Sequence, residues 1–194
     1  MVDRKQTKTI GEYWVAAELA RREWAPALTR DGLERTDILA AGTNTGATIQ
    51  VQVKTAMLAG PKPAVRWILG AKAQQPSMAP NEWFVLVAVP AQVDQTPRPF
   101  IVPRDHIAAA AWISHMEWLT DPSVPPGRRN GRVEHSRVGM EVFARYENQW
   151  DQLKNETSQA PILLPTHYHD LAQTQRVGLP PDHPWHDSMP DPWE

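Results

Sequence analysis

Three residues of one expected β-hairpin could together hydrolyse a phosphodiester bond. Asp37 lies in the short apolar run TDILA, and Gln52 and Lys54 lie on the polar side of the alternating run ATIQVQVKTA. Such alternation is typical of a half-buried strand, so Gln52 and Lys54 are expected one pleat apart on one face. Mg²⁺ and Mn²⁺ prefer oxygen ligands, which Asp37 supplies as a carboxylate and Gln52 as an uncharged carbonyl. Lys54 supplies positive charge to stabilise a phosphoryl transition state or orient the attacking water.

A further oxygen ligand is expected from the first helix. Bulky apolar residues recur at helical spacing over 10–23, with Thr9 as the expected N-cap. Glu12 shares a helical face with Val15 and Leu19, which directs its carboxylate toward the sheet. The same residue has a purely structural interpretation, because Thr9 followed three residues later by Glu12 is a capping-box pattern.

These residues, in this order, resemble the PD-(D/E)XK nuclease superfamily. Glu12 in GEYWVAAELA, Asp37 in RTDILA, and Gln52 with Lys54 in IQVQVK are similar to the family's helix glutamate, hairpin aspartate and E-x-K strand. The likeness covers roughly residues 8–120, most strongly 8–55, and is greatest for small restriction-endonuclease-like and Holliday-junction-resolvase-like members. It implies that Glu12, Asp37 and Gln52 bind Mg²⁺ or Mn²⁺. It also implies that Lys54 is the catalytic lysine.

The chain departs from the family pattern at two positions. Thr36 stands where family members have a proline, and Gln52 stands where the usual residue is acidic. The site therefore has one negative charge fewer, and its affinity for a divalent cation should be lower. Taken singly, Asp37 is also compatible with a strand-edge acid that pairs with Arg35 or Lys54. Gln52 and Lys54 are also compatible with a solvated strand face.

The order of elements predicts an α/β (α+β) fold, and the resemblance implies a restriction-endonuclease-like core with helices flanking a central mixed sheet. The turn AGTNTG joins the two hairpin strands, Pro26 should end the first helix, and the run WFVLVAV is typical of a strand buried on both faces. Strands are expected at 27–29, 36–40, 47–55, 66–69, 83–89 and 100–102, with a second helix at 105–119 and a helix or irregular segment at 140–153.

The composition changes at residue 155. This change divides the chain into a nuclease-like domain over 1–154 and a Pro/His/Asp-rich, mostly extended tail over 155–194. The apolar patch 162–164 and Trp185 are expected to hold the tail to the body. The tail carries a formal charge of −5 and residues 1–154 a formal charge of +3. A mildly basic body permits contact with phosphates.

A basic cluster follows the Pro-Pro-Gly turn at 125–127. It consists of Arg128, Arg129, Arg132 and Arg137, together with His135. Cations of this kind position proteins on nucleic-acid phosphates, so the cluster predicts a nucleic-acid contact. A solvated surface loop is the alternative interpretation.

The bulk composition limits the protein classes that remain. The 194 residues suit one domain with appendages, and the absence of cysteine excludes disulfides and thiolate chemistry and fits a cytoplasmic protein. Apolar runs fall short of the roughly 20 residues of a membrane-spanning helix, and MVDRKQTKT lacks the apolar core of a signal peptide. A membrane is therefore not an expected partner, whereas DNA is expected because the nuclease resemblance implies it. A homodimer is compatible with the sequence.

The sequence thus predicts a metal-dependent endonuclease that hydrolyses DNA phosphodiester bonds. One alternative is a nuclease-fold module with a weak or inactive site, which binds nucleic acid or a protein partner. Another is an interaction or toxin-type protein whose acidic tail masks its basic body.

Overall fold

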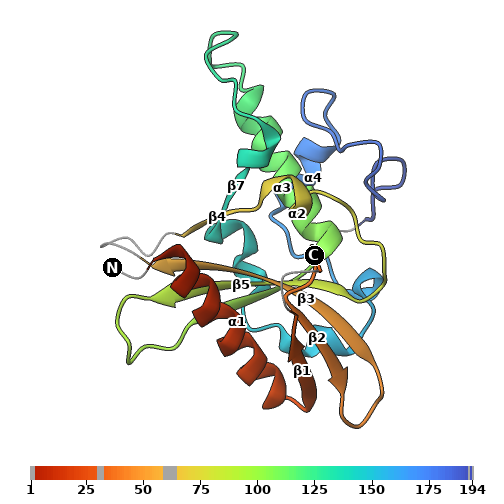
Figure 1. Cartoon of the computed structure of the whole chain (residues 1–194). Coiled ribbons are helices and arrows are strands. Elements are labelled where there is room, and N and C mark those ends of the chain that lie inside the picture. Colours follow the sequence, from red (N-terminus) through yellow and green to blue (C-terminus); the bar gives the residue numbers. More distant parts are fainter. Residues whose placement is uncertain (1–2, 30–32, 59–64, 192, 194) are drawn as a thin grey trace.

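The computed structural model describes residues 3–29, 33–58, 65–191 and 193. A five-stranded mixed sheet of order β1-β2-β3-β5-β6 lies at the centre, with α1 against one face and α3 against the other (Figure 1). The helices are α1 (Arg4–Ala20), α2 (Gly70–Ala73), α3 (Arg104–Leu119) and α4 (Thr166–Ala172). The strands are β1 (Trp24–Leu28), β2 (Ile38–Gly42), β3 (Thr48–Leu58), β4 (Arg66–Ile68), β5 (Glu82–Pro90), β6 (Arg98–Pro103) and β7 (Arg137–Gly139). The expected α/β class, with helices flanking a mixed sheet, is confirmed.

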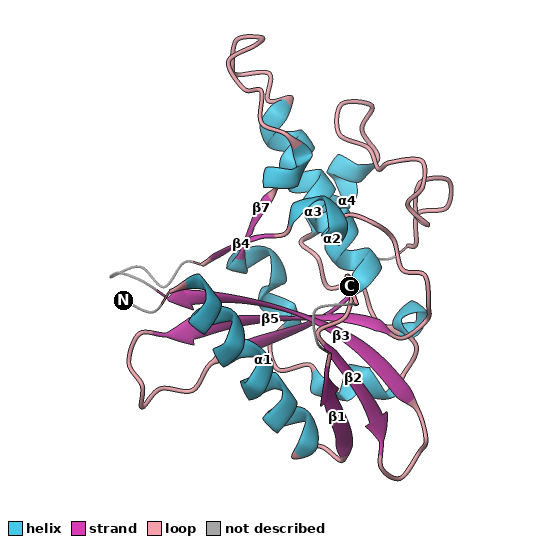
Figure 2. Ribbon diagram, viewed as in Figure 1, coloured by secondary structure: helices cyan, strands magenta, loops and turns pink. Residues whose placement is uncertain are grey.

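The β2–β3 hairpin has the antiparallel pairing that the sequence predicts, with Ile38 opposite Val51. Ile49, Val51 and Val53 pack on the α1 side of the sheet, so the even-numbered polar side chains of β3 face the other way. β5 runs parallel to β3, and all nine of its residues are buried because both of its faces are covered. β3 is the middle strand of the sheet (Figure 2), so its polar face lies close to the centre of the molecule.

Helix α1 begins at Arg4 rather than at residue 10. Asp3 is its N-cap: the Asp3 carboxylate accepts a hydrogen bond from the Gln6 N–H (2.8 Å), and the Gln6 side chain accepts one from the Asp3 N–H (3.2 Å). Thr9 lies inside the helix, so the capping-box interpretation of Glu12 is wrong. Residues 4–9 are all polar and carry no apolar period, which is why the sequence pattern misses the first turns.

Three other expectations change in detail. Pro26 does not end the first helix but lies within β1. β1 is an edge strand, and its outer side has no neighbouring strand to which an N–H group would have to donate. The strand expected at 66–69 is β4, and it pairs with β7 in a separate two-stranded sheet. The segment 140–153 forms two 3₁₀ helices, Met140–Tyr146 and Trp150–Lys154.

In the described part of the chain, every helix is too short or too polar to cross a bilayer.

The segment after residue 155 packs onto the α3 side of the sheet, where Figure 1 draws it in blue. It contains α4 and the 3₁₀ turn Thr157–Gln159, and most of its other described residues lie in turns and loops. The expected anchors, the patch 162–164 and Trp185, are buried. The segment shares a core with α3 through Ile162, Leu163, Leu164, Tyr168, Ala172, Val177, Leu179, Trp185 and Trp193.

A buried histidine joins α3 to this segment. His106 Nδ1 lies 2.8 Å from the Tyr146 hydroxyl, whose oxygen accepts a hydrogen bond from the Leu163 N–H (2.9 Å). The Tyr146 hydroxyl can donate to Nδ1 when the imidazole is neutral. Burial, and to a smaller extent the charge of His183, lower the pKa of His106 to about 3 from its ordinary 6.5.

We expect His106 to make the free energy of unfolding about 2 kcal/mol lower at pH 5 than at pH 7. Below pH 6.5 the unfolded chain binds a proton at His106, whereas the folded protein does not bind one until the pH approaches 3. The free energy of unfolding therefore decreases as the pH decreases from 6.5 to 3. Urea denaturation at the two pH values measures the difference. The pH dependence should shrink in H106Q and persist in H135Q, which changes an exposed histidine. Equal pH dependence in H106Q and the parent protein would contradict the prediction.

Candidate active site

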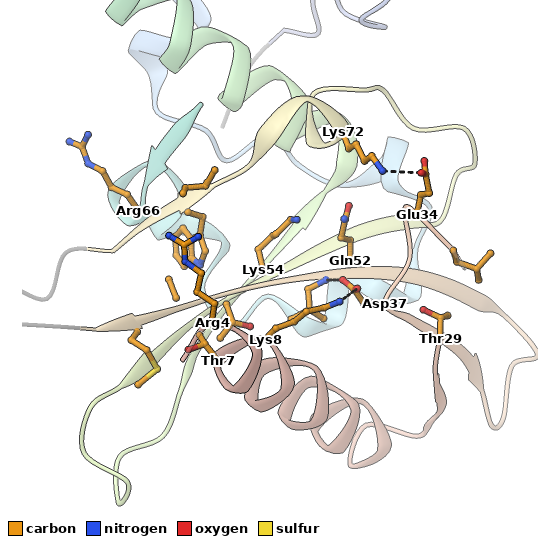
Figure 3. Close-up of a pocket in the computed structure, with 17 residues that line it drawn as sticks. Arg4, Thr7, Lys8, Thr29, Glu34, Asp37, Gln52, Lys54, Arg66 and Lys72 are labelled. Carbon is orange, nitrogen blue, oxygen red and sulfur yellow. Dashed lines mark hydrogen bonds and ion pairs between the residues drawn. The ribbon is translucent and has the colours of Figure 1, made fainter. Parts of the chain in front are cut away.

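The polar face of β3 borders a cavity of about 1020 Å³. The start of α1 and the β4–α2 region supply its other walls (Figure 3). Its cationic lining residues are Arg4, Lys8, Lys54, Arg66 and Lys72, whereas its acidic lining residues are Glu34 and Asp37. The cavity is therefore net positive, which favours anionic ligands such as phosphates.

Asp37 is fixed against β3 by two backbone contacts. It immediately precedes β2, where its N–H donates to the Val51 carbonyl at 2.9 Å. Its carboxylate Oδ2 accepts a hydrogen bond from the Val53 N–H at 2.8 Å. The second oxygen, Oδ1, lies 3.7 Å from Lys8 Nζ. The backbone thus orients one carboxylate oxygen and leaves the other directed at the cavity wall formed by α1.

Glu12 joins Asp37 through Lys8. Lys8 Nζ lies 3.3 Å from Glu12 Oε1 in an i,i+4 pair on α1, so one ammonium group contacts both carboxylates. Burial raises the pKa of Glu12, and the negative charge of Asp37 raises it further. Helix α1 can lie this close to β3 because residue 11 is glycine, and a Cβ there would overlap the Thr55 side chain.

Lys54 lies on the same side of β3 as Gln52, as Figure 3 shows. Burial lowers the pKa of its ammonium group, while the negative charge of Asp37 acts in the opposite direction. A cation that is partly desolvated in this way interacts more strongly with an anion than a solvated one does. Lys54 is therefore well placed to stabilise negative charge on a phosphoryl group in the cavity.

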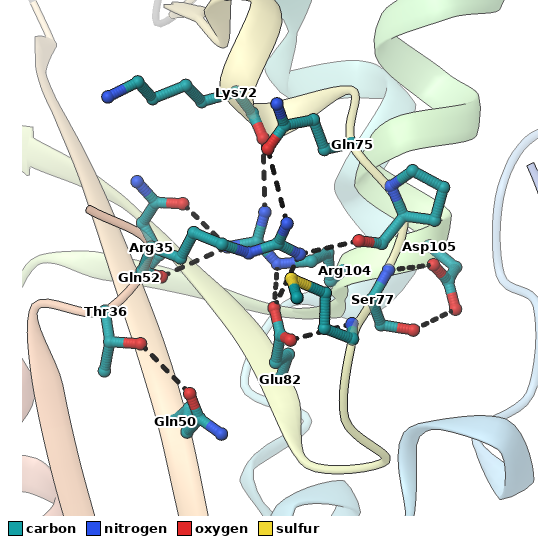
Figure 4. A network of polar contacts seen from close by, with 12 residues as sticks. Arg35, Thr36, Gln50, Gln52, Lys72, Gln75, Ser77, Glu82, Arg104 and Asp105 are labelled. Atoms are coloured by element: carbon teal, nitrogen blue, oxygen red, sulfur yellow. Dashed lines mark hydrogen bonds and ion pairs between the residues drawn. The ribbon is translucent and has the colours of Figure 1, made fainter. Parts of the chain in front are cut away.

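Gln52 lines the same cavity, but its carbonyl is already engaged. Oε1 accepts a hydrogen bond from Arg104 Nη2 at 3.0 Å. Arg104, the first residue of α3, is 1 % exposed and pairs with Glu82, which Arg35 also contacts (Figure 4). The predicted ligand oxygen thus points at a buried guanidinium.

The structure therefore places Asp37, Gln52 and Lys54 on one cavity, with Glu12 beside them through Lys8, and adds others that the sequence did not reveal. Lys8 could have been found, because a lysine four residues before Glu12 shares its helical face. Arg104 and Glu82 carry no comparable signal, since they are far from Gln52 in the chain and reach it only through the packing of β5 and α3.

Comparison with known proteins yields no relative. No protein-family model, no curated protein and no solved structure matches this chain. The resemblance to PD-(D/E)XK nucleases thus stays a prediction based on the residues above.

The donor chemistry of the site fits Mg²⁺ or Mn²⁺. Glu12 and Asp37 offer carboxylate oxygens, which these cations prefer. Burial and, after it, repulsion by Asp37 raise the pKa of Glu12, and a bound dication would relieve that repulsion as Lys8 does now. The described residues contain no cluster of three or more His, Cys, Asp or Glu side chains suited to a metal. A cation would therefore depend on these two acids, together with neutral oxygens.

The predicted arginine cluster lies apart from these residues. Arg129 donates to the Trp118 carbonyl (2.5 Å) and pairs with Asp121 (3.2 Å) at the end of α3. Arg132 and Arg137 line a second cavity of about 430 Å³, and Arg128 is an exposed loop residue. Arg66 on β4 lines both cavities, so the β4–β7 sheet connects the cluster to the candidate active site.

Proposed function

We propose that this protein is a Mg²⁺- or Mn²⁺-dependent nuclease of the PD-(D/E)XK type that hydrolyses DNA phosphodiester bonds. One observation carries the proposal: the Glu12 and Asp37 carboxylates share the Lys8 ammonium group beside a net-positive cavity that Asp37 and Lys54 line. Paired acids can hold a divalent cation, and a partly buried lysine can stabilise the negative charge that develops on the phosphoryl oxygens.

Each residue has a distinct task in this proposal. Glu12 and Asp37 would hold the cation, which when bound would act as a Lewis acid and lower the pKa of a water molecule. Asp37 keeps its orientation because the Val53 N–H holds Oδ2. Lys54 neutralises the charge that develops on the phosphoryl oxygens. Arg4, Arg66 and the arginine cluster contact flanking phosphates, so they contribute affinity but no base specificity.

The proposal is tested by incubating plasmid and linear DNA with the purified protein and Mg²⁺ or Mn²⁺. We expect cleavage that EDTA stops and that K54M slows by about 10²- to 10³-fold, the usual effect of removing one group that stabilises transition-state charge. K154M is the matched control, because Lys154 is exposed and pairs with Asp151 outside the cavity. Cleavage by K54M at the parent rate would refute the assignment.

A second function is favoured by a separate observation, namely that Glu12 and Asp37 both contact Lys8, whose ammonium group already offsets part of their charge. With this charge balance the protein could bind nucleic acid without cleaving it. In that case DNA binding in EDTA would be unaffected by D37A, and no condition would yield cleavage. Loss of affinity after neutralising Arg128 and Arg132 would then locate the binding surface.

A further inference from the structure

A buried ionic network lies directly behind Gln52. Glu82, on the first position of β5, contacts Arg104 Nε at 2.5 Å and Arg35 Nη2 at 2.9 Å, and its other oxygen accepts the Met78 N–H at 2.8 Å. Two guanidinium groups share one carboxylate, so the network carries a net positive charge. Figure 4 shows how it converges on Arg104.

Arg104 has little freedom to move. Besides Glu82 and Gln52, its guanidinium donates to the Arg35 carbonyl at 3.1 Å and to the Lys72 carbonyl at 3.3 Å. It also lies over the Phe84 ring, 4.8 Å from the ring centroid. A side chain with this many partners and 1 % exposure acts as a fixed donor.

This fixed donor determines the orientation of the Gln52 amide. A guanidinium has no acceptor, so the Gln52 group that faces Arg104 must be the carbonyl oxygen. A flipped amide would direct N–H at N–H in a buried position, which is strongly unfavourable. The Nε2 group is therefore turned away from Arg104, and no described residue accepts its hydrogen bonds. Because Gln52 lines the cavity, the group that remains for a ligand is a donor.

We propose that Gln52 is a hydrogen-bond donor to a phosphate oxygen rather than a metal ligand, and that Arg104 is the positioning residue that holds it so. The proposal rests on the proposed function, which brings a phosphodiester into this cavity. Gln52 and Lys54 lie two residues apart on one strand face, about 7 Å from each other, and both offer N–H groups to an anion. A glutamate at position 52 would instead pair with Arg104. The amide leaves the positive charge of the network unneutralised beside the phosphate.

Two variants of Gln52 separate a donor from a metal ligand. Gln52→Met removes both functions at similar volume, and Gln52→Glu keeps only acceptors. The readouts are the affinity for a short DNA oligonucleotide in EDTA and the affinity for Mn²⁺ alone. For Q52M we expect about tenfold weaker metal-free DNA binding, the effect of losing one hydrogen bond to a charged group, and unchanged Mn²⁺ affinity. Q52E should also bind metal-free DNA more weakly, whereas its Mn²⁺ affinity should rise.

The opposite pattern overturns the proposal: weaker Mn²⁺ binding by Q52M together with DNA affinity equal to that of the parent. Unchanged DNA affinity in Q52M overturns it as well, as does a parent protein that binds no oligonucleotide in EDTA. Failure of the nuclease proposal can be distinguished from failure of the Gln52 proposal. A parent protein that binds DNA without cleaving it would contradict only the nuclease proposal.

Arg104 is tested with R104M and R104K. Without the guanidinium the Gln52 amide can rotate, so R104M should bind metal-free DNA more weakly and Mn²⁺ more tightly. R104K restores a donor toward Oε1 and should recover part of the DNA affinity. Loss of the Arg104 charge alone would shift the two affinities in the same opposite directions, so R104M is repeated in the Q52M background. There an effect transmitted through Gln52 disappears, whereas a charge effect persists. Thermal unfolding establishes whether each variant is folded, and if R104M is not, the Gln52 variants decide the matter.

Discussion

Replacing Asp37 with asparagine is expected to lower the DNA-cleavage rate by at least about 10²-fold while leaving the fold intact. Asparagine keeps an oxygen that can accept the Val53 N–H hydrogen bond, which Asp37 Oδ2 accepts at 2.8 Å. It removes the negative charge that pairs with Lys8 and that raises the pKa of the neighbouring Glu12 carboxylate. Cleavage rate, Mn²⁺ affinity and urea denaturation, measured on one protein preparation, distinguish the loss of charge from the loss of structure.

Two further variants sharpen this test. D37A leaves the Val53 N–H without its partner, so it should cost about 1–3 kcal/mol of stability that D37N retains. D151N is the matched control, because Asp151 is an exposed acid on a 3₁₀ helix and its only ion pair is with Lys154 among the described residues. If D37N cleaves DNA and binds Mn²⁺ like the parent, Asp37 is a strand-edge acid and the metal site is elsewhere.

The parts of the site that the sequence predicts correctly are those set by local geometry. Strict alternation places Gln52 and Lys54 on one face of β3, and the short turn brings Asp37 beside that strand. Helical spacing alone places Glu12 toward the sheet. These relations depend on a few consecutive residues, so no knowledge of the tertiary structure is needed to infer them.

The chemical roles, in contrast, depend on contacts between distant segments. The sequence shows that position 52 is an amide but not which end of the amide faces the cavity. That choice is made by Arg104, which is 52 residues away along the chain and is held by Glu82 from another strand. Lys8 likewise changes the charge balance of the two acids only because α1 starts earlier than its apolar pattern indicates.

Composition is also a poor guide to the segment after residue 155. Its prolines and charges suggest an extended tail, since they suppress helical and strand periodicity. Packing does not require periodicity, however, and the apolar residues scattered through the segment cover the outer face of α3 and of the sheet. A masking role for the acidic residues therefore has to be tested by charge substitution, because deletion would remove part of the core.

Shortening the chain after Lys154 is accordingly expected to leave it unfolded, and Trp185→Ala alone should cost about 3–5 kcal/mol. Trp185 is 8 % exposed and lies between the rings of His106, His183 and Trp193, at centroid distances of 5.1, 5.0 and 5.5 Å. A loss of this size is comparable with the roughly 5–15 kcal/mol that stabilises an ordinary domain. Urea denaturation and circular dichroism of the three proteins provide the measurement.

The control for that prediction is Gln175→Ala, an exposed position of the same segment, where the change in stability should stay within about 0.5 kcal/mol. A truncated protein that retains the cooperative unfolding transition of the parent would show that residues 155–194 are an appendage after all. The distinction matters for the candidate active site, because the first residue of α3 is Arg104. The C-terminal segment packs on α3 two residues further along, at His106. Loss of the segment should therefore loosen the helix start that orients Gln52, and metal-free DNA affinity should fall in W185A before the protein unfolds.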